Sequence, residues 1–109
     1  MSMPERIANF IDGEWRPSAG TEALDVFNPA TAEILGRVPL SPAAEVEQAA
    51  QAGARAFAAW RRTPAVERVQ HLFRLKQLLE DELDALSRAI TLECGKTYDE
   101  AKAEMRRAI

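Results

Sequence analysis

The chain has 109 residues, of which 47% are hydrophobic and 28% charged, and its formal net charge is −3. This composition is typical of one small globular domain and excludes a chain that is disordered throughout. Acidic and basic residues are interspersed, so the sequence offers no basic face for nucleic acid and no polybasic patch for a membrane, and we expect neither partner.

The only cysteine is Cys94, which excludes an internal disulfide framework and favours a reducing compartment. The start of the chain, residues 1–6, is polar and lacks the apolar stretch of a secretory signal. No apolar run reaches the ~18 residues that a membrane span requires. We therefore expect a cytoplasmic protein.

The first strand-like segment ends in a hairpin signal. Phe10 and Ile11 lead into Asp12-Gly13, a pair that favours a two-residue turn, and residues 14–16 then form the returning strand.

Two further short strands are predicted over residues 24–27 and 34–38. Asn28 and Pro29 begin the turn between them, because proline presets the backbone angle at the second turn position. Pro39 is expected to end the second strand's ladder. The hairpin and these two strands are too short to make a stable sheet of their own, so we expect them to need a partner sheet.

From Ser41 onward the apolar residues follow the period of an α-helix. Ser41 is a suitable N-cap, and Pro42 suits the first helical position. One stripe then collects the apolar and small residues Val46, Ala49, Ala50, Gly53, Phe57 and Trp60. Its many alanines, with Gly53 among them, predict close packing against a neighbour, whereas Glu45 falls among the exposed positions.

A second cap-then-proline pair, Thr63-Pro64, predicts another helix start. The apolar pattern that follows runs to Ile90 and is too long for one ordinary helix, so we expect a break near Asp81. Gly95 suits the left-handed position that ends a helix.

Thr97 and Glu100 form a capping box, in which each side chain binds the other's backbone amide, so a fourth helix is predicted from Tyr98. The helical pattern continues to Ile109 without a closing residue, and we expect the chain to be the first part of a longer protein. Because strands precede helices, the sequence predicts an α+β segment, with strands within residues 9–40 and about four helices within residues 42–109.

Few residues suggest chemistry by themselves. Cys94 is a candidate nucleophile, but the carboxyl end of a helix beside Glu93 disfavours a thiolate. His71 lies about six helical turns earlier and does not easily reach it. We predict a structural Cys94 and a surface His71. No glycine-rich phosphate loop occurs.

The charged clusters have two possible interpretations. Adjacent acids at residues 80–82 do not face one point on a helix and are predicted to be solvated, and Arg106-Arg107 reads from spacing alone as a surface pair. Glu93 lies beside the unsatisfied carbonyls of a helix end, where hard oxygen ligands suit a cation. A plain surface acid is the alternative for Glu93.

Four motifs in order resemble the aldehyde dehydrogenase superfamily, and the resemblance covers almost the whole chain. They are Phe10-Ile11-Asp12-Gly13-Glu14-Trp15, Asn28-Pro29-Ala30-Thr31, Ala56-Phe57-Ala58-Ala59-Trp60 and Leu92-Glu93-Cys94-Gly95-Lys96. Within that superfamily, residues 38–41, 72–79 and 89–93 are most similar to the methylmalonate-semialdehyde dehydrogenase branch.

The resemblance implies an α/β enzyme with NAD as cofactor and CoA as co-substrate. In that branch a cysteine thiolate attacks malonate or methylmalonate semialdehyde, a hydride passes to NAD, and the acyl group passes to CoA with loss of carbon dioxide. The catalytic cysteine and the NAD-binding residues lie in motifs outside this chain. The resemblance therefore implies that residues 1–109 are an incomplete, amino-terminal part of the coenzyme-binding domain, inactive alone, of an enzyme that is a homo-oligomer.

The same resemblance implies roles for four residues. Glu93 and the carbonyls of Val26 and Phe27 would hold a monovalent cation, and Arg107 would pair with the substrate carboxylate. A guanidinium fork suits that pairing. The family flanks this arginine with glycines, whereas here Arg106 and Ala108 flank it.

Two alternatives stay open. The chain could belong to another aldehyde dehydrogenase, such as a succinate-semialdehyde type that releases a free acid. It could instead be a stand-alone helical interaction module that binds a partner through the stripe over residues 46–60.

Overall fold

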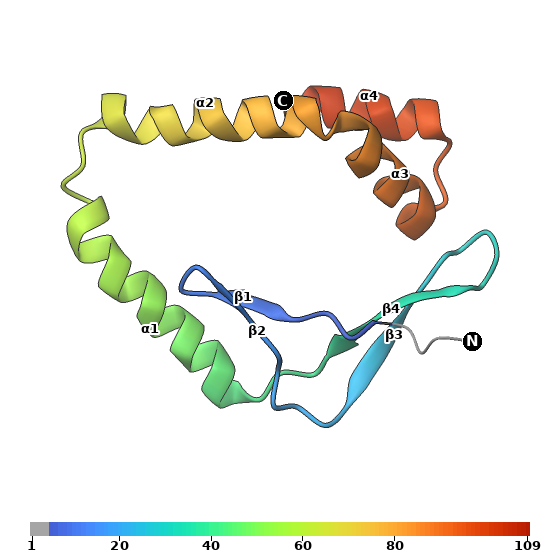
Figure 1. The fold of residues 1–109 in the computed structure, drawn as a ribbon, viewed down its shortest axis with the longest axis horizontal. Coiled ribbons are helices and arrows are strands. Elements are labelled where there is room, and N and C mark those ends of the chain that lie inside the picture. Colours follow the sequence, from blue (N-terminus) through green and yellow to red (C-terminus); the bar gives the residue numbers. More distant parts are fainter. Residues whose placement is uncertain (1–4) are drawn as a thin grey trace. The chain divides into compact units, whose positions relative to one another are not determined.

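The computed structural model describes residues 5–109, whose helices and strands are labelled in Figure 1, as two compact units. The first unit runs to Phe27 and again from Ile34 to Arg62, and the second holds Asn28–Glu33 and Thr63–Ile109. Residues 1–4, part of the polar start where we expected no secretory signal, lie outside the described residues. No helix within residues 5–109 has the length and apolar character that a bilayer crossing needs.

The first hairpin of the first unit forms as predicted. Strands β1 (Asn9–Ile11) and β2 (Glu14–Arg16) pair antiparallel. The two residues between them have positive φ angles, 56° at Asp12 and 80° at Gly13. A type I′ turn requires positive φ at both positions, and Asp-Gly is a pair that tolerates it.

A second antiparallel pair joins β3 (Ala23–Phe27) to β4 (Ile34–Pro39). The register shifts between Val26, which faces Gly36, and Phe27, which faces Ile34, so Leu35 has no partner opposite it. This irregularity is a β-bulge, which locally bends a strand and increases its twist.

Pro39 is the last residue of β4 and lies opposite Ala23, so the strand is one residue longer than predicted. The backbone N–H of Leu40 still donates to the carbonyl of Glu22 at 2.9 Å. Proline removes only its own donor, and a strand end is a position where that loss is tolerated.

Helix α1 (Ala43–Trp60) begins one residue later than predicted, and Ser41 is not its N-cap. Pro42 occupies that position with an extended ψ of 156° and no side-chain cap. The Ser41 hydroxyl instead donates to Ser18 Oγ at 3.1 Å and accepts from Asn9 Nδ2 at 2.8 Å. It is thus engaged by the preceding strands and loop.

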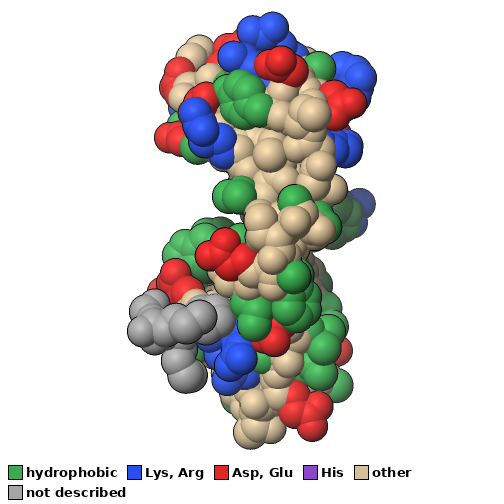
Figure 2. Space-filling view, turned by 90° about the vertical axis from the view of Figure 1, so that its right-hand side faces the viewer, with side chains coloured by type: hydrophobic (Ala, Val, Ile, Leu, Met, Phe, Trp, Pro, Cys, Tyr) green, Lys and Arg blue, Asp and Glu red, His purple; other side chains and the backbone are tan. Residues whose placement is uncertain are grey.

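The apolar stripe of α1 is exposed rather than packed. Only Ala52 is buried on this helix, and Val46, Phe57 and Trp60 are 62%, 57% and 42% exposed. A Cβ added at Gly53 would meet no atom within 4 Å among the described residues. The close packing predicted for the stripe is therefore not present within residues 5–109. Figure 2 shows further hydrophobic side chains at the surface, with acidic and basic side chains interspersed.

The second unit contains the remaining helices. Helix α2 (Ala65–Asp81) begins after Pro64, which is its N-cap and carries no side-chain cap, so Thr63 was wrongly expected to cap it. Helix α3 (Leu83–Cys94) follows a break at Glu82, whose ψ of 13° interrupts the helix where a break near Asp81 was predicted.

The end of α3 and the start of α4 (Tyr98–Ala108) follow the predicted local chemistry. Gly95 has a φ of 71° and ends α3 in the left-handed conformation. Thr97 accepts from the backbone of Glu100, whose carboxylate accepts from the backbone of Thr97, and so the capping box is confirmed.

Small residues fill the contact between α3 and α4. Ser87 and Ala101 are both 0% exposed, and the Ser87 hydroxyl donates to the Leu83 carbonyl at 2.6 Å, which satisfies its buried donor. Side chains of this size let two helices approach closely. Two short antiparallel sheets followed by four helices confirm the predicted α+β segment.

Candidate functional site

A cluster of charged side chains surrounds the linker between α3 and α4. Lys96 lies in this linker, and its ammonium donates to the carboxylate of Glu104, two turns into α4. The hydrogen bond and the charge of Glu104 raise the pKa of Lys96, and Lys96 in turn lowers the pKa of Glu104. The pair ties the linker to the helix that carries Arg107.

Arg107 lies in the last turn of α4 and is exposed. It follows Glu104 by three residues, a spacing that places two side chains side by side on a helix. Its positive charge further lowers the pKa of Glu104 and opposes the rise in the pKa of Lys96. Within residues 5–109 its guanidinium forms no ion pair, so it is available to an anion.

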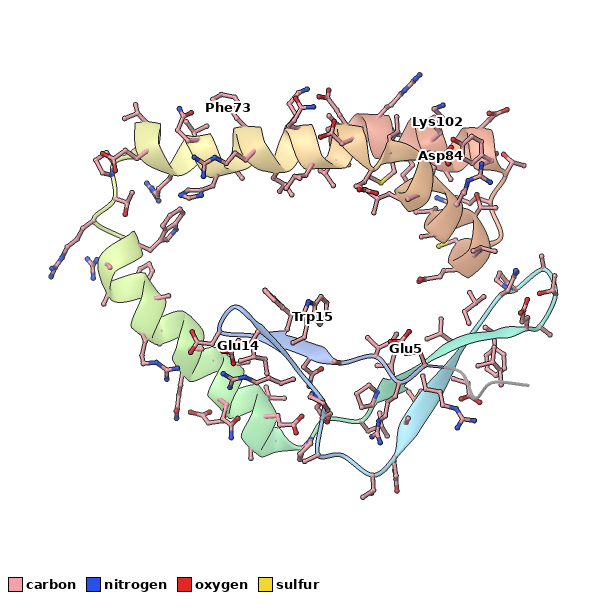
Figure 3. The ribbon with its side chains drawn as sticks, in the orientation of Figure 1. Glu5, Glu14, Trp15, Phe73, Asp84 and Lys102 are labelled. Atoms are coloured by element: carbon pink, nitrogen blue, oxygen red, sulfur yellow. The ribbon has the colours of Figure 1, made fainter. Side chains whose placement is uncertain are left out.

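A second cluster joins the first turns of α3 and α4. The Tyr98 hydroxyl and Arg88 Nε both donate to the carboxylate of Asp84, the latter at 2.8 Å. Arg88 Cζ and Lys102 Nζ lie 5.4 and 5.6 Å from the centre of the Tyr98 ring, within the range of cation–π attraction. Figure 3 shows Asp84 on α3 and Lys102 on α4.

These contacts change the acid–base properties of their members in opposite directions. The hydrogen bond from Tyr98 lowers the pKa of Asp84, and the same bond raises the pKa of Tyr98. The carboxylate also raises the pKa of Arg88. Because the cluster joins α3 to α4, it helps to fix the direction of the helix that carries Arg107.

The predicted cation ligands are divided between the two units. Glu93 is exposed in the last turn of α3, whereas Val26 and Phe27 lie in β3 at the bulge. A carboxylate and backbone carbonyls are hard oxygen donors, which suit an alkali or alkaline-earth cation. Within residues 5–109 no three His, Cys, Asp or Glu side chains are grouped for a metal, so any such site depends on carbonyl donors.

The turn that follows Phe27 packs against the end of α3. Residues Asn28–Glu33 belong to the second unit, and a Cβ added at Gly95 would lie 2.9 Å from Pro29 Cγ. Asn28 is 7% exposed, and its Oδ1 accepts from the Ala30 backbone N–H at 2.9 Å. The turn is thus held by its own hydrogen bonds beside the helix end that carries Glu93.

The described residues do not fit the phosphates of a dinucleotide. A helix amino terminus attracts phosphate through free N–H groups and positive dipole. Each of the four helices instead carries its own acid in the first turn, namely Glu45, Glu67, Asp84 and Asp99 with Glu100. These carboxylates repel a phosphate at all four helix starts.

The other candidate residues occupy ordinary helix surfaces. Cys94 is exposed as the last residue of α3, and His71 is exposed on α2. In the acidic run, Glu80 accepts from Lys76, and Asp81 Oδ1 accepts from Gln77 Nε2 at 2.9 Å. Both bonds span four residues along one helix face, and residues 80–82 are exposed, as predicted.

Glu45 was expected to be exposed, and this was wrong because the loop over residues 17–20 folds over it. Its carboxylate is half-buried and accepts from the Ala19 backbone N–H at 2.6 Å, from Ser18 Oγ at 2.7 Å and from Asn9 Nδ2 at 3.2 Å. The bond from Ala19, followed by that from Ser18, lowers the pKa of Glu45. The residue anchors this loop to the start of α1.

Sequence reasoning also missed the Lys96–Glu104 and Asp84–Tyr98 pairs. They span eight and fourteen residues, across the linker or between helices. Of the bonds in these clusters, the sequence could have predicted the one between Asp84 and Arg88, since these residues are four positions apart on one helix.

Two small antiparallel sheets are followed by four helices, and the Leu92–Lys96 segment lies at the junction of α3 and α4. A model described as "Aldehyde dehydrogenase family" matches residues 15–109, so the chain belongs to that family.

Single proteins and solved structures also match this chain, and their names are narrower than that of the family. Malonate-semialdehyde dehydrogenase of Bacillus cereus (strain B4264) is 45% identical over 105 residues, which are 96% of this chain and 22% of that protein. The crystal structure of methylmalonate-semialdehyde dehydrogenase from Oceanimonas doudoroffii matches with a TM-score of 0.89 at 39% identity, over 96% of this chain and 21% of that one. A structure from Sinorhizobium meliloti 1021 in complex with NAD matches with a TM-score of 0.87 at 32% identity, over 94% of this chain and 21% of that one. The chain thus spans about a fifth of the length of its relatives.

Proposed function

We propose that this chain is the amino-terminal part of an NAD-dependent, CoA-acylating dehydrogenase of malonate or methylmalonate semialdehyde. The observation that carries the proposal is the 45% identity to a malonate-semialdehyde dehydrogenase over 96% of the chain. Because the chain spans 22% of that relative, the activity belongs to the complete protein, and residues 1–109 alone are expected to be inactive.

The proposed reaction balances without a further oxidant. Malonate semialdehyde, CoA and NAD⁺ give acetyl-CoA, carbon dioxide and NADH, and methylmalonate semialdehyde gives propionyl-CoA in the same way. NAD would supply the hydride acceptor, and CoA would accept the acyl group. Within residues 5–109 the four helix starts offer no site for dinucleotide phosphates, so we place the NAD contacts and the catalytic cysteine outside this chain.

Arg107 is the proposed partner of the substrate carboxylate. It lies exposed at the end of α4 and forms no ion pair within the described residues. A guanidinium binds a carboxylate through two parallel hydrogen bonds, which orients the substrate as well as attracting it. Arg106 and Ala108 beside it keep the helix going to its end, where glycines would loosen it.

Glu93 remains the proposed carboxylate ligand of a monovalent cation, with the carbonyls of Val26 and Phe27 as further donors. The pairing of β3 with β4 shifts register between Val26 and Phe27, so the regular ladder is interrupted beside the carbonyls proposed as ligands. If the proposal holds, replacing potassium and sodium by a bulky organic cation lowers the melting temperature of the complete protein, and Glu93→Gln removes that dependence. An unchanged response in Glu93→Gln would contradict it.

The reaction is tested with the complete gene product that contains this chain. Purified protein is mixed with NAD and malonate, methylmalonate or succinate semialdehyde, with and without CoA. We expect CoA-dependent NADH formation with the first two aldehydes and an acetyl- or propionyl-thioester detected by mass spectrometry. Release of free succinate without CoA would instead support a succinate-semialdehyde enzyme.

The same preparation tests the remaining expectations. We propose a cytoplasmic homo-oligomer within whose coenzyme-binding domain these residues lie, and light scattering gives its mass. Absence of turnover with every aldehyde would favour the alternative of a helical interaction module.

A further inference from the structure

The Lys96–Glu104 ion pair lies beside the one cation for which a substrate role is proposed. Lys96 Nζ binds the carboxylate of Glu104, and Glu104 precedes Arg107 by three residues on α4. The side chains of Lys96 and Glu104 are 44% and 43% exposed, so both lie at the protein surface, as Arg107 does. Lys96 of the linker thus contacts α4 at Glu104, three residues before Arg107.

Without Lys96, Glu104 would be an unpaired carboxylate three residues before Arg107 on the same helix. Side chains three residues apart on a helix are close enough for an ion pair. A guanidinium engaged by its own helix is a weaker receptor for an outside carboxylate. The mutual effects on pKa agree with this arrangement, since Arg107 lowers the pKa of Glu104 and opposes the rise in that of Lys96.

We propose that Lys96 is a positioning residue that occupies the carboxylate of Glu104 and thereby keeps the guanidinium of Arg107 available to the carboxylate of the aldehyde substrate. This inference rests on the proposed function of Arg107. It assigns Lys96 a role in substrate selectivity, in addition to holding the linker against α4.

The test uses the complete protein and two aldehydes of similar size, malonate semialdehyde and uncharged propanal. Lys96→Met is expected to raise KM for malonate semialdehyde about two- to fivefold, the range set by an exposed ion pair, with little change in kcat. KM for propanal is expected to stay constant, because propanal has no carboxylate. Lys96→Arg is expected to restore the original KM, as is Glu104→Gln in the Lys96→Met background.

Lys76 provides a matched control. It forms an ion pair with Glu80 on α2, and the two side chains are 49% and 43% exposed, much like the Lys96 pair. Lys76→Met is expected to leave both KM values unchanged. If Lys96→Met fails to fold, Glu104→Gln alone still tests the idea, because it is expected to leave KM for malonate semialdehyde unchanged or lower.

The outcomes separate this inference from the function on which it rests. If Arg107→Gln raises KM for malonate semialdehyde by about 30-fold or more but Lys96→Met affects both aldehydes equally or neither, Lys96 has no positioning role and the function stands. A rise in KM in Glu104→Gln would likewise overturn the inference. If Arg107→Gln does not affect selectivity between the aldehydes, both proposals are overturned.

Discussion

Replacing Gly95 by alanine tests how the end of α3 and the Asn28–Glu33 turn are held together. Gly95 has a φ of 71°, which costs an ordinary residue roughly 1–2 kcal/mol. The added Cβ would also lie 2.9 Å from Pro29 Cγ, closer than real contacts allow. Overpacking of this kind costs about 1–3 kcal/mol, so Gly95→Ala is expected to destabilise this unit by about 2–5 kcal/mol.

A double-mutant cycle separates the two costs. Pro29→Ala removes the Cγ atom and leaves the Cβ at an ordinary distance of 3.8 Å. In that background Gly95→Ala is expected to cost only the backbone part, so the coupling is about 1–3 kcal/mol. Gly95→Asn is expected to keep the packing cost and to lose much of the backbone cost. Asparagine tolerates the left-handed region, but it also carries a Cβ. Gly13→Ala is the control for backbone cost alone, since the φ of Gly13 is 80° and a Cβ there would meet no described atom within 4 Å.

The assay is native-state hydrogen exchange of the complete protein, read by mass spectrometry on peptides from the Asn28–Glu33 turn and from α3. Local opening free energies follow from the protection of backbone amides. A cost of 2 kcal/mol lowers protection by about 30-fold. Equal losses for alanine at positions 95 and 13, together with no coupling to Pro29, would refute the contact between the turn and the helix end.

Four further substitutions are expected to change stability, two of them in opposite directions and two in a pH-dependent way. Gly20→Ala would place a Cβ 2.2 Å from the carbonyl oxygen of Leu40 and is expected to destabilise its unit by about 1–3 kcal/mol. Gly53 lies inside α1, and a Cβ there would meet no atom of residues 5–109 within 4 Å, so Gly53→Ala is expected to stabilise the same unit by up to about 1 kcal/mol. Lower hydrogen-exchange protection of α1 in Gly53→Ala would contradict this. Because hydrogen bonds lower the folded-state pKa of Glu45, its stabilising effect is present above its usual 4.5 and is lost as pH falls through the lower folded value, so the stability difference from Glu45→Gln should shrink in acid. Tyr98 has a raised folded-state pKa, so its contribution is present below 10.0 and is lost as pH rises through the higher folded value; Tyr98→Phe should remove this alkaline loss, and an unchanged alkaline melting curve would count against the bond to α3.

Sequence predicted the elements whose chemistry is local. The Asp12-Gly13 turn, the end of α3 at Gly95 and the capping box at Thr97 each depend on residues within four positions of one another. Each was found where the sequence placed it, because backbone conformation there is set by one or two side chains.

Two predictions were wrong because they depended on tertiary contacts. Ser41 matched the N-cap preference, but its hydroxyl binds side chains from the preceding strand and loop. Glu45 matched an exposed helix position until the loop over residues 17–20 covered it. No local signal describes either contact, since the partners are more than twenty residues away.

The site was predicted in a similarly uneven way. Resemblance drew attention to Arg107 and Glu93, whose proposed roles remain to be tested. It did not suggest Lys96 or Tyr98, because their partners Glu104 and Asp84 are brought near only by the fold of α3 against α4.

The unpaired Leu35 in β4 also limits how this hairpin can evolve. Side chains alternate between the two faces of a strand, so one extra residue reverses the alternation beyond it. Loss of that residue alone would turn the remaining side chains of the strand to the wrong face. Among descendants of this gene, single-residue insertions or deletions in the hairpin should therefore occur in compensating pairs, one on each strand.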